Sequence, residues 1–453
     1  MFSEGFTNLI EYAVNTLQKA DFEEFEISCV DREYSLTRFA NSTIHQNVAD
    51  HTYRFQFRVA KEKRICENTL TSLTKTSIDR TIKELESMLI FVPKISFFQG
   101  FPEPTDYTIP TVSSTGNLLD EFQRADIVET SVNEAEQVDR DAKLAGSVIT
   151  NDVRFQIINS NGVDLSHRIT YNRLIINSLT EKENKGYGKE EQNVRNPSKF
   201  SPELLSRKAT ELSVNTCSTK DYPYGEYEVI LSPSAVQSIL LFLTSSFGAV
   251  SFHESQSFIT DQIGEQLFDK KITLYDDPLN PNTILASPFD GEGVSKKLSF
   301  IIEEGVPKTV IYDNFFASKY LNDKKRTTGH RIIPFSDYVW SSVTPLNAIL
   351  TPGDSSLTEM IEETKKGFFI NRLHYTNFVN RRLGVITGLT RDGLLYIEDG
   401  EVVSAAKNFR FTDILPQFLK NVPLISKETE TGTRAITPAI KLDSFKFTGK
   451  SKH

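Results

Sequence analysis

A histidine and a glutamate that stand side by side, His253 and Glu254, are the residues of this chain best suited to metal-assisted chemistry. Their surroundings favour a helix, and a helical His-Glu pair begins the metal site of several zinc peptidases. There the histidine binds zinc, the glutamate activates a water molecule, and a second histidine four residues after the first completes the pair. In this chain that position is Ser257 and the next is Phe258, so the second histidine is absent.

Catalytic zinc needs three protein ligands and an open position, and His253 beside one carboxylate is an incomplete set. Folding could bring in replacement ligands, for which the candidates are Asp276, Asp277, His330 and His374. An isolated histidine in a helix more commonly makes only a local hydrogen bond. We therefore predict that His253 is the remnant of a metal ligand and Glu254 the remnant of a catalytic base. No cofactor is expected, and the sequence does not identify substrate-binding residues.

Patterns for other kinds of catalysis are absent from the sequence. It contains no Gly-x-Ser-x-Gly nucleophile elbow, no P-loop and no dinucleotide-binding fingerprint. The acidic pair Asp276-Asp277 precedes Pro278, where it is more typical of a turn than of acid–base catalysis. Asp290 and Glu292 flank Gly291 and could point into a pocket.

The composition is that of a soluble protein with several cores. Its 453 residues favour about two or three domains, and 32 Phe and 15 Tyr can fill them. A net charge of −9 argues against a broad surface that binds nucleic acid directly. Three widely spaced cysteines indicate a reducing compartment, no apolar run could span a membrane, and the N-terminus lacks a signal peptide. We expect a cytoplasmic protein.

The order of the elements suggests two small units before a larger one. Residues 1–105 combine helices at 8–20 and 78–90 with strands at 25–30, 34–39 and 52–59. Residues 106–222 begin with a charged helix at 116–143, for which Asp126 is the predicted break. They continue with a hairpin around Asn159-Ser-Asn-Gly162, a mobile loop at 182–197 and a helix at 202–216.

Residues 223–453 form the larger unit. A strand at 226–231 leads to a helix capped by Ser232, and a shorter helix near 257–268 precedes a strand at 272–275. The remainder has the pattern of strands and turns, with one clear helix at 355–367. The expected fold class is α+β: two small helix-plus-antiparallel-sheet units followed by a mainly antiparallel β domain with embedded helices.

Short motifs in a fixed order carry a family resemblance over nearly the whole chain. They include Phe39-Ala-Asn-Ser-Thr-Ile-His45, Thr273-Leu-Tyr-Asp-Asp-Pro278, Ser287-Pro-Phe-Asp-Gly-Glu-Gly293, Leu350-Thr-Pro-Gly353 and Thr387-Gly-Leu-Thr-Arg-Asp-Gly393. In this order and spacing the chain resembles the TldD/PmbA family, the so-called modulators of DNA gyrase. The resemblance implies a structural turn at Asp290–Gly293, beside the site.

The resemblance also implies two types of subunit, one catalytic and one not. One type looks like a zinc metallopeptidase with His-Glu-x-x-x-His and a late cysteine as the third ligand, and the other is its metal-free partner. In this chain His253 and Glu254 match the start of the motif, but Phe258 stands in the place of the second histidine. Residues 427–438, where the cysteine would fall, contain none. The chain is thus closer to the metal-free PmbA/TldE type.

Such a chain is expected to be a non-catalytic subunit that pairs with a zinc-bearing TldD-like homologue and helps to process or degrade unfolded peptides. A homodimer is the other expected assembly, and no direct contact with nucleic acid or membrane is expected. One alternative is an active metallopeptidase with an altered ligand set. Another is a stand-alone regulator of gyrase or of toxin–antitoxin proteins.

Overall fold

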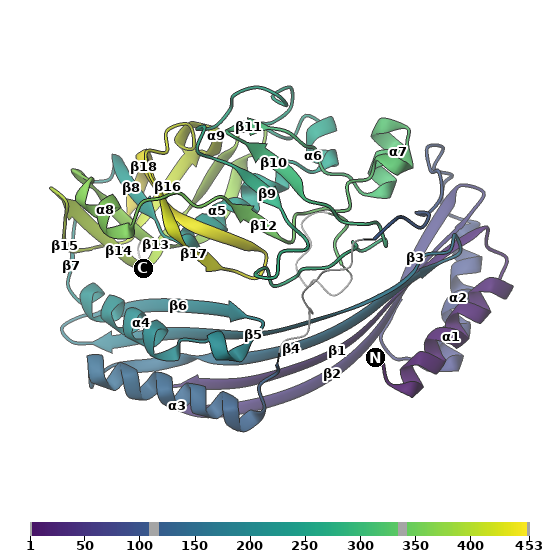
Figure 1. Ribbon diagram of the computed structural model, residues 1–453, viewed down its shortest axis with the longest axis horizontal. Helices are drawn as coiled ribbons and strands as arrows, with labels where there is room; N and C mark the ends of the chain where they lie inside the picture. The colour runs from purple at the N-terminus through teal and green to yellow at the C-terminus, as the bar shows by residue number, and fades with distance from the viewer. Residues whose placement is uncertain (1, 108–116, 334–341, 451–453) are drawn as a thin grey trace.

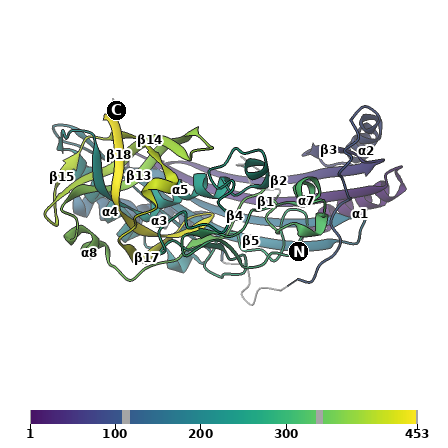
Figure 2. The same ribbon diagram turned by 90° about the horizontal axis from the view of Figure 1, so that it is seen from above.

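Two bodies make up the computed structural model, which describes residues 2–107, 117–333 and 342–450. The N-terminal half forms a curved, antiparallel sheet of six strands in the order β3-β2-β1-β4-β5-β6, called sheet A below. The C-terminal half lies on the concave face of sheet A, and helices α1 to α4 cover the opposite face (Figure 1). Seen from above, the strands of sheet A run beneath the C-terminal body and reach α1 and α2 at the far end (Figure 2).

The elements of the N-terminal half alternate between helices and long strands. They are α1 (Glu4–Lys19), β1 (Glu24–Ala40), β2 (Thr43–Lys61), β3 (Arg64–Leu70), α2 (Lys75–Leu89), α3 (Glu121–Val138), β4 (Lys143–Asn159), β5 (Asp164–Glu181), β6 (Lys185–Val194) and α4 (Pro202–Thr216). Strands from residues 1–105 and from residues 106–222 share sheet A, because β1 pairs with β4 over fourteen positions, Glu26–Phe39.

Alternation along β1 explains why both faces of sheet A are covered. Ile27 and Cys29 point to one face and pack against α1 and α2, whereas Val30 points to the other and packs against residues of the C-terminal half. Successive side chains of a strand alternate between faces, so one strand supplies both cores. The two strands predicted at 25–30 and 34–39 are therefore one continuous strand. The helix predicted to break near Asp126 is the unbroken α3.

The loop predicted at 182–197 is wrong, since most of it forms β6. Its polar sequence misled the prediction because two of its glycines face a helix rather than solvent. A Cβ on Gly186 would lie 1.8 Å from the Ser213 carbonyl oxygen of α4, and one on Gly188 would lie 1.9 Å from that of Ala209. Glycine thus allows α4 to pack directly on the backbone of the strand.

The C-terminal half is built on a larger mixed sheet, called sheet B below. Its elements are β7 (Thr219–Lys220), β8 (Glu226–Leu231), α5 (Pro233–Ser245), α6 (Ala249–His253), β9 (Leu274–Asp276), β10 (Ser299–Glu303), β11 (Val306–Pro307), α7 (Asn314–Leu321), β12 (Ala348–Leu350), α8 (Leu357–Glu362), β13 (Lys366–Asn380), β14 (Val385–Glu398), β15 (Glu401–Ala406), β16 (Phe409–Ile414), α9 (Leu415–Phe418), β17 (Ile425–Thr431) and β18 (Ala435–Lys450). Most pairs are antiparallel, whereas β12–β18, β8–β13 and β7–β15 are parallel. The α+β class is confirmed.

Helix α5 begins as predicted, with Ser232 as N-cap, and packs its apolar side chains into the core of sheet B. The predicted helix at 257–268 is wrong. Within it, Asp261 and Gly264 have positive φ, a left-handed conformation that a right-handed helix cannot contain. The short helix α6 ends before this stretch, at His253. Among the described residues, no helix is long and apolar enough to cross a membrane.

A buried ion cluster joins the two halves of the molecule. Arg58 of β2 donates from one guanidinium nitrogen to Glu26 of β1 at 2.8 Å and to Glu292 of the C-terminal half at 3.1 Å. The other Glu292 oxygen accepts from the Asn314 backbone, and Asp290 accepts from the backbones of Glu292 and Arg331. The predicted turn at Asp290–Gly293 is thus a structural turn held in place by buried carboxylates.

Two carboxylates share one cation in this cluster, and this makes stability depend on pH. Burial, partly offset by Arg58, raises the pKa of Glu26 to about 7. The folded protein then binds more protons than the unfolded chain between about pH 4.5 and 7, so this residue's contribution to the free energy of unfolding falls as pH rises through that window.

Glu26→Gln removes the titrating group. The free energy of unfolding of the native protein, minus that of the variant, should fall by up to about 3 kcal/mol between pH 4.5 and 8. Urea unfolding of both proteins across this range measures the difference, and Glu129→Gln on the exposed face of α3 controls for the loss of one carboxylate. A difference that is constant with pH would contradict the role given to Glu26.

Candidate functional site

His253 and Glu254 lie at the exposed end of α6, against α7. The imidazole stacks on the ring of Tyr320 with centroids 4.3 Å apart, and its Nε2 shares a hydrogen bond of 2.8 Å with the hydroxyl of Tyr312. Glu254 accepts a hydrogen bond of 3.0 Å from the Tyr320 hydroxyl and lies 3.5 Å from the Lys319 ammonium. The side chains of His253 and Glu254, predicted to be remnants of a metal site, therefore both contact residues in or next to α7.

The charge around this pair does not favour a cation. Burial and then the neighbouring Lys319 ammonium lower the pKa of His253, so the ring is neutral at physiological pH. The Lys319 ammonium also lies 4.6 Å from the centre of the Tyr320 ring and donates to the Tyr320 hydroxyl at 3.0 Å. A divalent ion at His253 would face an ammonium group where a second ligand is required.

Phe258, which stands in the place of the second histidine, belongs to the hydrophobic core. Only 8% of its surface is exposed, and its ring packs against Phe268 and closely approaches Gly384. The chain leaves the helix at Glu254, and Ser257 donates a hydrogen bond of 2.8 Å to the Ser246 carbonyl. This path turns residue 258 into the core of sheet B, away from His253.

A cavity lies elsewhere, between sheet A and the C-terminal half. It is a cleft of about 580 Å³. One wall is the concave face of sheet A, with Tyr34, Val153 and Tyr171. The opposite wall is formed by α5, with Leu240 and Leu241, and by loop segments that include Val343–Pro345 and Thr433–Ala435. Residues 433–435 belong to the segment in which the family's cysteine ligand was expected. They line this cleft on the same side as α5, whereas His253 and Glu254 are not part of its lining.

The residues that line the cleft do not fit a metal ion. Among those that the structure describes there is no histidine or cysteine, and the single carboxylate is Glu191. Glu191 receives two hydrogen bonds from Arg173, at 2.9 and 2.7 Å, so the guanidinium already neutralises it. Helix α5 itself contains no histidine, cysteine, aspartate or glutamate.

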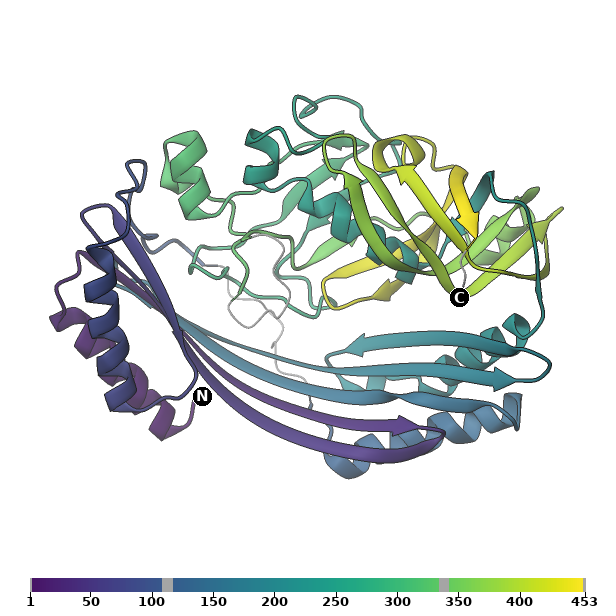
Figure 3. The ribbon, with the colours of Figure 1, turned by 180° about the vertical axis from the view of Figure 1, so that it is seen from behind.

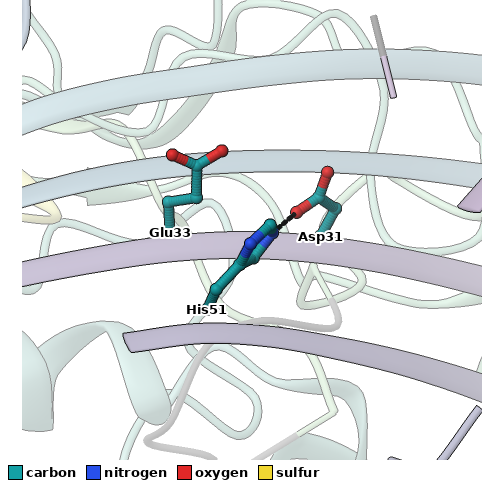
Figure 4. Close-up of side chains that lie close together, drawn as sticks. All are labelled: Asp31, Glu33 and His51. Atoms are coloured by element: carbon teal, nitrogen blue, oxygen red, sulfur yellow. Dashed lines mark hydrogen bonds and ion pairs between the residues drawn. The ribbon is translucent and has the colours of Figure 1, made fainter. Parts of the chain in front are cut away.

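A different group of metal-ligand types lies on the helix-covered face of sheet A. Asp31 and Glu33 of β1 and His51 of β2 place one ligand atom each within 4.8 Å of one another, and Figure 4 shows the hydrogen bond between His51 and Asp31. The Arg154 guanidinium donates to Asp31 at 3.2 Å and to Glu33 at 3.1 Å. Because this cation already lies between the two carboxylates, the group is an ion-pair network rather than a vacant metal site.

Of the four replacement ligands considered from the sequence, Asp276 and His330 come together in the structure. Their nearest oxygen and nitrogen atoms are 3.7 Å apart in the core of the C-terminal half, and the Lys296 ammonium lies 3.5 Å from the same Asp276 oxygen. Burial lowers the pKa of His330 to about 4, so the ring is neutral. Lys296 supplies the counter-charge to Asp276, so the group is a buried ion pair beside a neutral histidine. Asp277 and His374 do not join it.

The sequence did not predict this cleft, because its walls come from segments that are far apart along the chain. On α5, Leu240 and Leu241 both line the cleft, and Leu241 is 39% exposed. An exposed leucine beside polar Gln237 and Thr244 on the same helix is the one local signal of a binding surface there.

Comparison with known proteins supports the metallopeptidase resemblance. The family models for the PmbA/TldA metallopeptidase C-terminal domain and central domain match residues 224–449 and 119–216. An uncharacterised protein of Methanocaldococcus jannaschii is 24% identical over 351 residues, which cover 76% of this chain and 79% of that protein. The metalloprotease PmbA of Escherichia coli O157:H7 is 20% identical over 265 residues, or 58% of this chain and 54% of that protein. The matched region thus spans about half the length of the latter relative.

The fold itself has been seen in a solved structure. TldE from Thermococcus kodakarensis matches with a TM-score of 0.86 over 98% of this chain and 99% of that chain, at 20% sequence identity. At this identity the likeness shows the fold alone, including the arrangement of sheet A and the C-terminal half.

The core position of Phe258 has a measurable consequence. Phe258→Ala should lower the free energy of unfolding by about 3–5 kcal/mol, because it leaves a cavity in the core of sheet B. The same substitution at Phe122, which is 73% exposed on α3, is the matched control and should leave stability unchanged. Denaturant unfolding measures both, and a loss below about 1 kcal/mol for Phe258→Ala would place this ring outside the core.

Proposed function

The chain belongs to the PmbA/TldD metallopeptidase family, and we propose that it acts there as a non-catalytic subunit. In this proposal a zinc-bearing homologue cleaves unfolded peptides, and this chain helps to hold them. The proposal rests on the shortage of metal-binding side chains in the cleft between sheet A and the C-terminal half. Its described lining offers no histidine or cysteine, and its one carboxylate is paired with Arg173.

The walls of the cleft support a role in holding peptide. Apolar residues such as Val153, Leu240, Leu241, Val343 and Pro345 line the cleft together with polar ones, which include three arginines and one glutamate. Clefts of roughly 300–1,000 Å³ with this character bind organic ligands, and apolar peptide side chains are such ligands. Binding of this kind needs shape and apolar surface but no nucleophile and no metal.

The second candidate function is a metallopeptidase with an altered ligand set. It is favoured by the Asp31, Glu33 and His51 group, in which a histidine and two carboxylates converge. Arg154 weighs against it, because a metal ion would have to displace a guanidinium from both carboxylates at once. Elemental analysis separates the two functions.

The purified chain should contain no stoichiometric zinc, either as isolated or after incubation with zinc and dialysis. Inductively coupled plasma mass spectrometry measures this, and His253→Ala and His51→Ala should leave the result unchanged. One zinc per chain that is lost in His51→Ala would establish the second function. One zinc per chain that is lost in His253→Ala would show that the pair on α6 still binds metal.

The peptidase activity of the complex should depend on this chain without coming from it. The chain alone should not hydrolyse an unfolded peptide, and addition of a zinc-bearing homologue should produce hydrolysis. Replacement of the glutamate in the homologue's His-Glu motif should abolish that hydrolysis, because the catalytic base is then missing. Hydrolysis by the isolated chain would contradict the proposed function.

Leu241 offers a test of the cleft itself. Leu241→Glu should raise the KM of the complex for an apolar peptide about tenfold or more, since a carboxylate replaces apolar surface at the cleft wall. Leu357→Glu on α8 is the matched control, because Leu357 is also 39% exposed but lies outside the cleft. Equal KM values for the two variants would remove the cleft from peptide binding.

A further inference from the structure

The charge of the cleft between sheet A and the C-terminal half is opposite in sign to that of the whole chain. Its described lining contains three arginines, Arg32, Arg173 and Arg434, and the single carboxylate of Glu191, which together give a net charge of +2. The whole chain has a net charge of −9. A cleft lined by an excess of one sign concentrates ligands of the opposite sign. The lining therefore favours a ligand with an anionic group.

The wall formed by sheet A carries a row of polar side chains. Tyr34 of β1, Asn151 of β4 and Tyr171 of β5 lie opposite one another on adjacent strands and line the cleft. Arg32 donates to the Asn151 amide oxygen at 3.1 Å, and its guanidinium lies 5.4 Å from the centre of the Tyr34 ring. In Figure 3 these long strands curve beneath the C-terminal body, which supplies the opposite wall.

The Tyr34 hydroxyl lies in a positive electrostatic potential. Burial raises the pKa of Tyr34, and three guanidinium groups act in the opposite direction, those of Arg32, Arg173 and Arg38. No carboxylate of the described residues acts on this hydroxyl. Glu191 of β6 is three strands away from β1, roughly 14 Å at about 4.8 Å per strand, and it is paired with Arg173. The one carboxylate of the lining therefore does not cancel the positive charge beside Tyr34.

Arg434 extends from the C-terminal half towards the same wall. It stands between β17 and β18, and its backbone carbonyl accepts a hydrogen bond of 3.0 Å from Ala348 of β12, which holds the segment at the cleft. Burial lowers the pKa of Arg434, and the phenol of Tyr171 acts against this shift. Since the net effect is a lower pKa, the surroundings of the guanidinium destabilise its charged form. A ligand carboxylate at this place would stabilise it.

We propose that the cleft binds peptides through a carboxylate group and that Arg434 is the residue that receives it. This inference deepens the proposed function and rests on it, because it names the class of peptide that the chain would hold. Such a peptide combines apolar side chains with a C-terminal carboxylate or an acidic side chain.

The chemistry of the cleft suits both parts of such a peptide. A guanidinium presents N–H groups in a planar fork that matches the two oxygens of a carboxylate. The apolar side chains of Leu240 and Leu241 lie on the same side of the cleft as Arg434. They offer a surface for apolar side chains, and they lower the local dielectric constant, which strengthens the pairing of charges.

Four peptides with one apolar, unfolded sequence and an acetylated N-terminus test the inference. The first has a free C-terminal carboxylate and the second a C-terminal amide. The third has the amide and one internal glutamate, and the fourth has the amide and a glutamine in its place. Isothermal titration calorimetry with the native chain should give a dissociation constant at least about tenfold lower for the first than for the second, or for the third than for the fourth. The pair that differs identifies the source of the carboxylate.

Arg434→Gln should abolish this difference, because the carboxylate peptide then binds about tenfold more weakly while the amidated peptide binds as before. Arg434→Lys keeps the positive charge without the planar fork and should retain part of the difference. The matched control is Arg80→Gln on α2. The Arg80 side chain is 71% exposed and lies outside the lining of the cleft, so this variant should keep the full difference.

Three results would overturn the inference. Equal dissociation constants for all four peptides would do so and leave the proposed function standing, since the chain would still hold peptides. A carboxylate preference that persists unchanged in Arg434→Gln would show that another residue receives the group. Failure of all four peptides to bind would contradict the proposed function itself and the inference with it.

Discussion

The shared guanidinium of Arg58 is the interaction on which the arrangement of the two halves depends. It lies between a carboxylate of sheet A and a carboxylate of the C-terminal half, with the Phe101 ring 5.1 Å away. A cation buried this deeply needs an adjacent negative charge, and removal of the Arg58 guanidinium would leave two carboxylates buried without their counter-charge. The turn that carries Glu292 is therefore held against β1 and β2. The start of α7 is held with it, because the Asn314 backbone donates to the same carboxylate.

Apolar contacts around this cluster complete the junction and set the dimensions of the cleft. Phe155 of β4 packs edge-on against Phe289, with centroids 5.4 Å apart. Gly293 permits the close approach, because a Cβ there would lie 2.6 Å from a methyl group of Val163. The two halves also touch at β6, where the Asn371 side chain of β13 donates to the Lys189 carbonyl. The cleft lies between sheet A and α5, and both apolar and polar side chains line it.

The remnant of the metal motif and the cleft are separate features of the molecule. His253 and Glu254 contact aromatic residues in or near α7, while α5 and Thr433–Ala435 line the cleft on the side opposite sheet A. Each place where histidine and carboxylate groups gather also contains a lysine or arginine: Lys319 at Glu254, Arg154 at Asp31, and Lys296 at Asp276. At these three places a cation of the chain itself pairs with the acidic group, which supports the proposal of a non-catalytic subunit.

The sequence by itself determined the family, the α+β class, most helix positions and the absence of the second histidine. These rest on local properties: periodicity in α4, the serine cap of α5, the Asn-Gly turn of the β4–β5 hairpin, and residue identity at position 258. Only the tertiary structure decided that β6 is a strand, that Phe258 lies in the core, and that a cleft faces α5. These depend on contacts between segments far apart in the chain, such as Gly188 with Ala209 or Leu241 across from β4. Local pattern cannot encode such contacts, because a residue's neighbours across a sheet are set by how the chain returns to it.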